Sequence, residues 1–84
     1  MRFTVVLPPA LAAPGTDTYI LSAWRKEIGD LVLQGEPIAT VRPADADAAD
    51  KPIDVPSPAF GILARKSVLE GDGIETGEPL GILS

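Results

Sequence analysis

The stretch that decides the fold occurs twice, first as Gly29-Asp30-Leu31-Val32-Leu33-Gln34-Gly35-Glu36-Pro37-Ile38-Ala39-Thr40-Val41 and again as Gly71-Asp72-Gly73-Ile74-Glu75-Thr76-Gly77-Glu78-Pro79-Leu80-Gly81-Ile82-Leu83. The glycines, the first aspartate and the Glu-Pro pair recur in register, and apolar residues fall at matching positions, so turn chemistry and core positions repeat together. The second copy begins 42 residues after the first (29 to 71). Two repeats are too few for a solenoid, so the pattern predicts two quasi-equivalent halves of one small domain.

Length and composition limit what the chain can do. Its 84 residues suffice for one domain with a modest core, and we assign residues 1–84 to a single domain. Cysteine and histidine are absent, which removes thiolate and imidazole nucleophiles and the commonest general base at neutral pH. We therefore expect no enzyme and no catalytic residues. A net charge of −5 argues against nucleic-acid binding, which depends on lysine and arginine neutralising phosphates.

The amino-terminal apolar run is short. It extends from Phe3 to Leu7 and stops at Pro8-Pro9, before it reaches the length of a signal-peptide core. No other segment of the sequence is long and apolar enough to span a membrane. We expect a cytoplasmic protein without a membrane partner.

Short apolar segments separated by glycine and proline predict an all-β fold, a small barrel or sandwich without helices. The segment from Pro8 to Asp17 is expected to be a loop, because it contains three prolines and a glycine. The expected strands are Phe3–Leu7, Thr18–Trp24, Leu31–Leu33, Pro37–Arg42, a strand through Ile53 and Val55, Ile62–Val68 and Leu80–Leu83.

The segment from Pro43 to Lys51 alternates alanine and aspartate and is expected to form an exposed hairpin tip. Its acidic residues are Asp45, Asp47 and Asp50. They lack the spaced oxygen ligands and the glycine of a calcium loop, so we expect no metal site. Solvation and protection against edge pairing explain the charges.

An ordered set of residues is similar to the lipoyl/biotinyl carrier domain family, closest to the lipoyl domains of 2-oxo acid dehydrogenase acyltransferase subunits. The resemblance covers nearly the whole chain and implies a flattened barrel or sandwich of two four-stranded sheets with pseudo-two-fold symmetry. Trp24 is expected to be a core or half-buried packing residue and not a stacking platform, because no basic groove with further aromatic residues accompanies it. The matching residues are Trp24, Gly29-Asp30, Val32, Gly35, Ile38-Ala39, Asp50-Lys51, the run from Asp54 to Gly61, Glu70-Gly71-Asp72, Gly77 and Leu80.

The resemblance implies a cofactor carried on one lysine at the tip of a hairpin, here the hairpin between Val41 and Ile53. Lys51 is the candidate for covalent attachment of lipoate. Biotin is not expected, because the family's biotin site places its lysine between methionines and the only methionine here is Met1.

Lys51 is displaced from the family's pattern. Counting forward from Gly29-Asp30 places the modified position at Asp45, and counting back from Ser57-Pro58 places it at Asp50, so the hairpin is longer by five residues. Lys51 lies one residue late and precedes Pro52. Because a one-residue shift moves a side chain to the opposite face of a strand, a ligase that recognises the lysine by its place on the turn is expected to modify it poorly.

Two functions remain open at this point. One is a carrier domain serving a 2-oxo acid dehydrogenase-like acyl-transfer system, which implies as partners a lipoate ligase or lipoyl synthase and a multienzyme complex. The alternative is an unmodified lipoyl-like interaction module whose acidic hairpin binds an unknown protein. Leu11 lies in the loop that corresponds to a recognition loop of lipoyl domains, and it either is an exposed anchor or folds back on the barrel.

Overall fold

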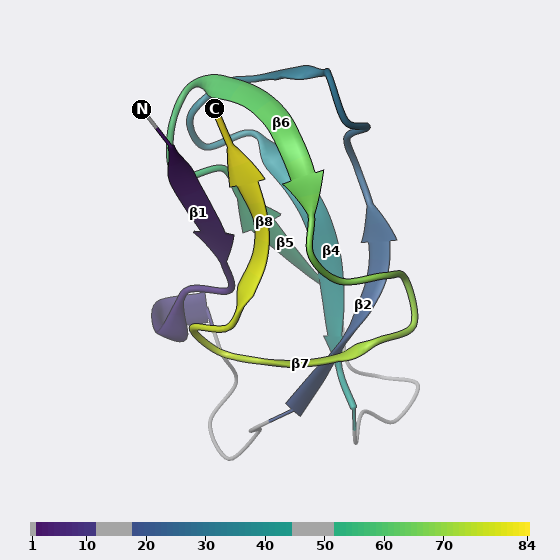
Figure 1. Cartoon of the computed structure of the whole chain (residues 1–84). Coiled ribbons are helices and arrows are strands. Elements are labelled where there is room, and N and C mark those ends of the chain that lie inside the picture. Colours follow the sequence, from purple (N-terminus) through teal and green to yellow (C-terminus); the bar gives the residue numbers. More distant parts are fainter. Residues whose placement is uncertain (1, 12–17, 45–51) are drawn as a thin grey trace.

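Two four-stranded antiparallel sheets form a flattened barrel in the computed structural model (Figure 1). The structure describes residues 2–11, 18–44 and 52–84. The first sheet has the order β1-β8-β6-β3, with bounds β1 Phe3–Val6, β8 Pro79–Leu83, β6 Gly61–Lys66 and β3 Leu31–Val32. The second has the order β5-β4-β2-β7, with bounds β5 Ile53–Pro56, β4 Pro37–Pro43, β2 Thr18–Trp24 and β7 Gly73–Glu75. The expected all-β fold of two four-stranded sheets is confirmed.

The two sheets are related by pseudo-two-fold symmetry. Exchanging β1 with β5, β8 with β4, β6 with β2 and β3 with β7 converts one strand order into the other. The repeated glycines have matching left-handed backbones, with φ of 97° and 94° at Gly29 and Gly71 and of 84° and 81° at Gly35 and Gly77. A residue with a Cβ is strained in this region, which is why glycine recurs at these turns. The expected equivalence of Gly29 and Gly71 is confirmed.

The repeated turns also join the two halves. The backbone N–H of Gly29 donates to the carbonyl of Leu63 in the other half, and that of Gly71 donates to the carbonyl of Leu21, both at 2.8 Å. The two hydrogen bonds are equivalent under the repeat, because the two donors and the two acceptors are each 42 residues apart. Each half therefore completes hydrogen bonds of the other, and the barrel forms as one unit.

Each repeated carboxylate closes its own turn by accepting a hydrogen bond from the backbone N–H three residues earlier. A side-chain acceptor at this spacing satisfies a turn N–H that the strand ladders leave unpaired. In each pair the first residue donates its backbone N–H and the second accepts with its carboxylate: Glu27 and Asp30 (2.9 Å), Leu69 and Asp72 (2.9 Å), Leu33 and Glu36 (3.1 Å), and Glu75 and Glu78 (2.9 Å). The repeated Gly-Asp and Gly-Glu pairs thus combine a left-handed glycine with the acid that closes the turn.

Glu36 makes the stability of one turn depend on pH. The backbone N–H of Leu33, together with Lys26 Nζ at 3.2 Å from the carboxylate, lowers the pKa of Glu36 below its ordinary value of 4.5. A lowered pKa contributes stability that is present above 4.5 and is lost as the pH falls through the folded-state value. We expect Glu36→Gln to lower Tm at pH 7, and the difference from wild type to shrink as the pH falls below 4.5.

Thermal melts between neutral pH and pH 3 measure this effect, with Glu78→Gln as the matched control. Glu78 closes the equivalent turn, and no lysine pairs with it among the described residues. A Tm difference for Glu36→Gln that stays constant across the acid range would contradict the assignment.

The core lies between the two sheets. Trp24 is half-buried beside it, donates from Nε1 to the carbonyl of Val68 at 3.0 Å, and has Lys66 Nζ 5.4 Å from its ring centroid. The expected packing role of Trp24 is confirmed. The buried core side chains are Val5, Leu7, Tyr19, Leu21, Val32, Ile38, Ala39, Val41, Val55, Leu63, Ile74, Leu80 and Leu83.

Two short elements differ from the sequence-based expectation. The loop after β1 contains a single 3-10 turn, η1 (Pro9–Leu11), in which Leu11 N donates to Pro8 O at 3.0 Å. The strand β7 was not expected, because Gly73 and Glu75 give it little β propensity. Among the described residues, no helix has the length and hydropathy needed to cross a membrane.

Candidate functional site

The candidate site is the β4–β5 hairpin, which the sequence placed between Val41 and Ile53. Val41 and Ile53 are cross-strand partners, so the hairpin is confirmed at these bounds. The backbone N–H of Ala44 donates to the carbonyl of Thr18 at 3.0 Å, which continues the pairing with β2 past the end of β4. The residues predicted for the hairpin tip lie outside the described residues: Lys51 as the attachment site, and Asp45 and Asp50 as the two alternative registers.

A polar network fixes the stem of this hairpin. Thr40 and Asp54 are cross-strand partners, and the Thr40 hydroxyl donates to Asp54 Oδ1 at 3.0 Å. The same hydroxyl accepts a hydrogen bond from Arg25 Nη1 at 3.3 Å. Thr40 is 8% exposed, so this hydroxyl is buried with both its donor and its acceptor functions satisfied. The network joins β4 and β5 to the residue that follows β2.

We expect Thr40→Val to lower the free energy of unfolding by about 1 kcal/mol, because it removes two hydrogen bonds at nearly constant volume while Asp54 and Arg25 regain water. Urea denaturation measures the change. Thr4→Val is the control, since Thr4 is the exposed counterpart of Asp54 on β1. Equal effects of the two variants would mean that the network adds nothing to the stem.

The chain contains three lysines, and the amines of Lys26 and Lys66 form ion pairs in the structure. Lys26 Nζ is 3.2 Å from Glu36 Oε2, and its side chain is 23% exposed. Lys66 Nζ is 3.2 Å from Glu27 Oε2, lies over the Trp24 ring, and belongs to a side chain that is 19% exposed. Acylation of either amine would break an ion pair on the barrel wall.

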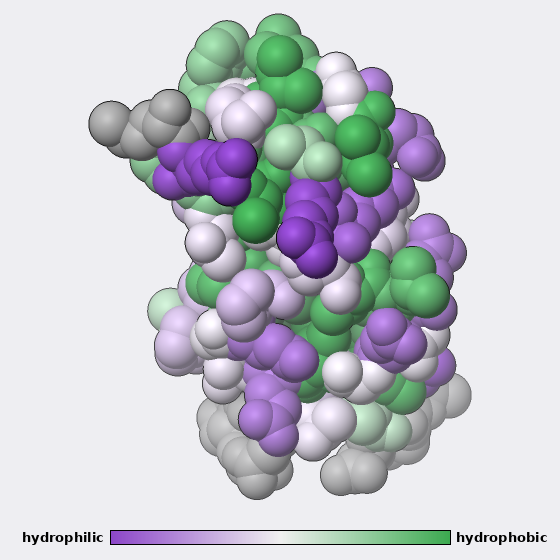
Figure 2. Space-filling view, in the orientation of Figure 1, coloured by the Kyte–Doolittle hydropathy of each residue, from purple (hydrophilic) through white to green (hydrophobic). Residues whose placement is uncertain are grey.

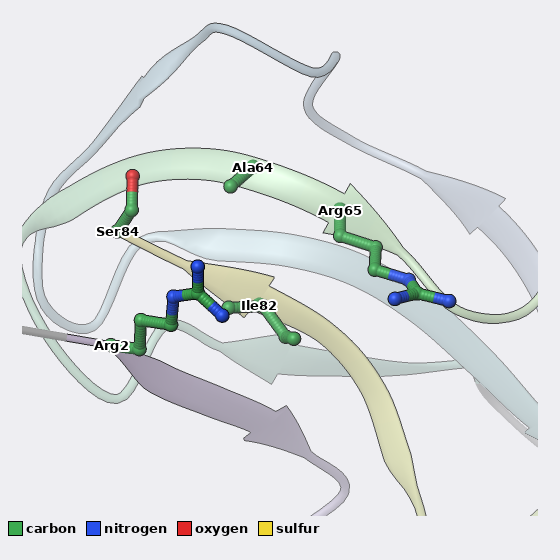
Figure 3. Close-up of a pocket in the computed structure, with 5 residues that line it drawn as sticks. All are labelled: Arg2, Ala64, Arg65, Ile82 and Ser84. Carbon is green, nitrogen blue, oxygen red and sulfur yellow. The ribbon is translucent and has the colours of Figure 1, made fainter.

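Three further surface features were considered as sites: the loop around Leu11, possible metal-binding clusters and one shallow depression. Leu11 is 40% exposed and lies outside the core, so of the two alternatives for it the exposed position is the observed one. Within the described ranges, no three His, Cys, Asp or Glu side chains gather to hold a metal ion. A shallow depression of about 360 Å³ lies on the outer face of the β1-β8-β6 strands and is lined by Arg2, Ala64, Arg65, Ile82 and Ser84 (Figure 3).

The barrel of two symmetry-related sheets, with its repeated turns and its β4–β5 hairpin, is the fold of a lipoyl domain. Among solved structures, the chain is similar to the lipoyl domain of the 2-oxoglutarate dehydrogenase complex from Azotobacter vinelandii. The TM-score is 0.63 at 24% sequence identity, and the match covers 98% of this chain and 96% of that one. No protein-family model matches the sequence. No curated protein matches it.

Proposed function

We propose that this chain is a lipoyl-type carrier domain that serves a 2-oxo acid dehydrogenase-like acyl-transfer system, with Lys51 as its attachment residue. The observation that carries the proposal is the distribution of amines on a lipoyl-domain fold. The β4–β5 hairpin contains Lys51, whereas Lys26 and Lys66 are held in ion pairs on the barrel. An exposed amine on a hairpin is what covalent attachment requires.

The chemistry of a carrier divides between the group and the protein. A lipoyl group bound as an amide supplies a long arm that takes up acyl groups and raises their local concentration at successive active sites. The chain itself supplies the lysine and a stem that limits where the arm begins. Thr40, bonded to Asp54 and Arg25, restricts movement of β4 against β5 and so preserves the position of the hairpin.

As a carrier, the chain depends on other proteins for every chemical step. A lipoate ligase or a lipoyl synthase modifies it, and a multienzyme complex uses the modified form. We place it in the cytoplasm and assign it no enzymatic activity of its own, because the sequence offers neither cysteine nor histidine for catalysis.

Intact mass after co-expression with a lipoate ligase and excess lipoate tests the proposal. We expect a minor fraction of the chain to gain about 188 Da, or about 126 Da where octanoate is transferred instead. The fraction stays minor because Lys51 lies one residue late in the hairpin. The added mass should map to Lys51, disappear in Lys51→Arg and persist in Lys26→Arg.

Complete absence of the added mass at saturating ligase, with the chain folded, would overturn the carrier proposal. The unmodified interaction module would then be the function to pursue. Added mass on Lys26 or Lys66 would instead contradict the assignment of Lys51, because both amines are engaged in the folded barrel.

A further inference from the structure

Four large apolar side chains lie exposed beside one another on the first sheet. They are Leu31 (54% exposed), Leu33 (53%), Phe60 (63%) and Ile62 (45%), and together we call them the apolar patch. Leu31 and Ile62 are cross-strand partners on β3 and β6, and Leu33 and Phe60 are the next residues along the same pair of segments. Figure 2 shows apolar surface gathered at the upper end of the molecule, where β6 begins in Figure 1.

The pseudo-symmetry shows that the barrel does not require apolar residues at three of these four positions, whereas the residue equivalent to Ile62 is Ile20, which is also apolar. The residues 42 positions from Leu31 and Leu33 are Gly73 and Glu75, which form the equivalent strand β7. The residue equivalent to Phe60 is Thr18, at the start of β2. Both halves have the same fold, so folding does not account for the exposed apolar side chains of Leu31, Leu33 and Phe60.

The strands of the first sheet carry basic but no acidic side chains. The chain has 12 acidic residues, yet β1, β8, β6 and β3 contain none. Arg2 and Arg65 flank Ile82 on the outer face of this sheet (Figure 3), and neither takes part in the ion pairs of the described residues. Asp30, which precedes Leu31, directs its carboxylate into its own turn. An acidic protein thus presents one face that combines apolar side chains with unpaired guanidinium groups.

We propose that the outer face of the β1-β8-β6-β3 sheet is a docking surface for a partner segment that carries apolar side chains flanked by carboxylates. The apolar patch buries the partner's apolar side chains, and Arg2 and Arg65 pair with its acidic groups. A second copy of the chain is a poor occupant, because a symmetric contact through this face would oppose guanidinium groups with no carboxylate on the strands to offset them.

This surface goes beyond the proposed carrier function and is independent of it. The apolar patch lies near the ends of β4 and β5 marked by Pro37 and Pro56, whereas the hairpin joins the opposite ends, at Pro43 and Ile53. A partner bound to the first sheet therefore leaves the β4–β5 hairpin accessible. The interaction is expected whether or not Lys51 is modified.

Titration of the isotopically labelled chain with short synthetic peptides, followed by NMR amide shifts, tests the proposal. One peptide alternates leucine with glutamate, a second alternates leucine with lysine, and a third alternates serine with glutamate. We expect saturable shifts only with the first peptide, centred on β3, the start of β6 and the neighbourhood of Ile82. Saturable binding of the leucine–lysine peptide, or shifts confined to β4 and β5, would overturn the proposal.

Matched variants assign the contacts. Leu33→Glu reproduces the residue found at the equivalent position, Glu75, so it is compatible with the fold, and it should weaken binding about tenfold. Arg65→Glu should weaken it similarly, whereas Arg42→Glu, an exposed arginine on the second sheet, should not. Equal effects of Arg65→Glu and Arg42→Glu would overturn the proposal. So would a concentration-dependent dimer in sedimentation experiments that Leu33→Glu abolishes, because it would assign the face to a second copy.

Discussion

Gly81→Ala is expected to lower the free energy of unfolding by about 3 kcal/mol, the largest stability change that we predict for a single added methyl group. A Cβ at Gly81 would lie 2.5 Å from the carbonyl oxygen of Arg65 and 3.2 Å from Cη2 of Trp24. The carbonyl belongs to the paired backbone of β6, so it cannot move aside as a side-chain end can. Urea denaturation of the purified variant measures the loss.

Gly73→Ala is the matched control. Gly73 also lies in a strand, but the nearest atoms to its added Cβ would be Thr18 Cγ2 at 3.8 Å and Tyr19 O at 4.0 Å, which are ordinary contacts. We expect this variant to remain within about 0.5 kcal/mol of wild type. If both variants lost the same stability, the close approach of β8 to β6 at Gly81 would be wrong.

The position of Gly81 also shows where the two halves differ. Its equivalent in the first half is Ala39, which is fully buried in β4 and tolerates a methyl group. At Gly81 the ring of Trp24 reaches the same space, and the residue equivalent to Trp24 is Lys66. The large side chain of Trp24 thus occupies the space that a methyl group at position 81 would need, whereas Ala39 keeps its methyl group in the other half.

Much of the fold could be predicted because the deciding residues carry local chemistry. A glycine followed by an acid that closes the turn works through bonds within three or four residues, so Gly29-Asp30 and Gly71-Asp72 fix their turns directly. The 42-residue offset then relates the two halves without knowledge of any contact. The hairpin between Val41 and Ile53 was instead predicted from the resemblance to lipoyl domains.

Other features depend on contacts between distant segments and could not be predicted. The requirement for glycine at position 81 arises from Arg65 and Trp24, neither of which is near it in sequence. Leu31 and Leu33 are exposed because their side chains face the outer side of the sheet, while Val32 between them is buried, whereas an apolar run by itself is equally typical of a buried strand. The pairing of Thr40 with Asp54 and Arg25 likewise needed the register of three strands.

The hairpin variant with the largest expected effect changes the register of the lysine. Deleting Asp45–Ala49 restores the usual hairpin length and leaves the sequence Pro43-Ala44-Asp50-Lys51, in which the lysine is still one residue late. Exchanging the last two residues, by Asp50→Lys with Lys51→Asp, moves the amine by one position and leaves the net charge unchanged. We expect this shortened, exchanged hairpin to be lipoylated almost completely by a standard ligase, as a gain of about 188 Da in intact mass.

The controls separate length from register. The deletion alone should remain mostly unmodified, because it leaves the lysine one residue late and so on the other face of the hairpin. The exchange alone places the lysine at the position counted back from Ser57-Pro58 but leaves the hairpin five residues longer than usual, so it should also remain mostly unmodified. Since Thr40 and Asp54 pair well before the tip, all three variants should keep the melting temperature of the wild-type barrel. If the shortened, exchanged hairpin were folded but still rejected, the barrier to modification would lie on the barrel and not in the position of the lysine.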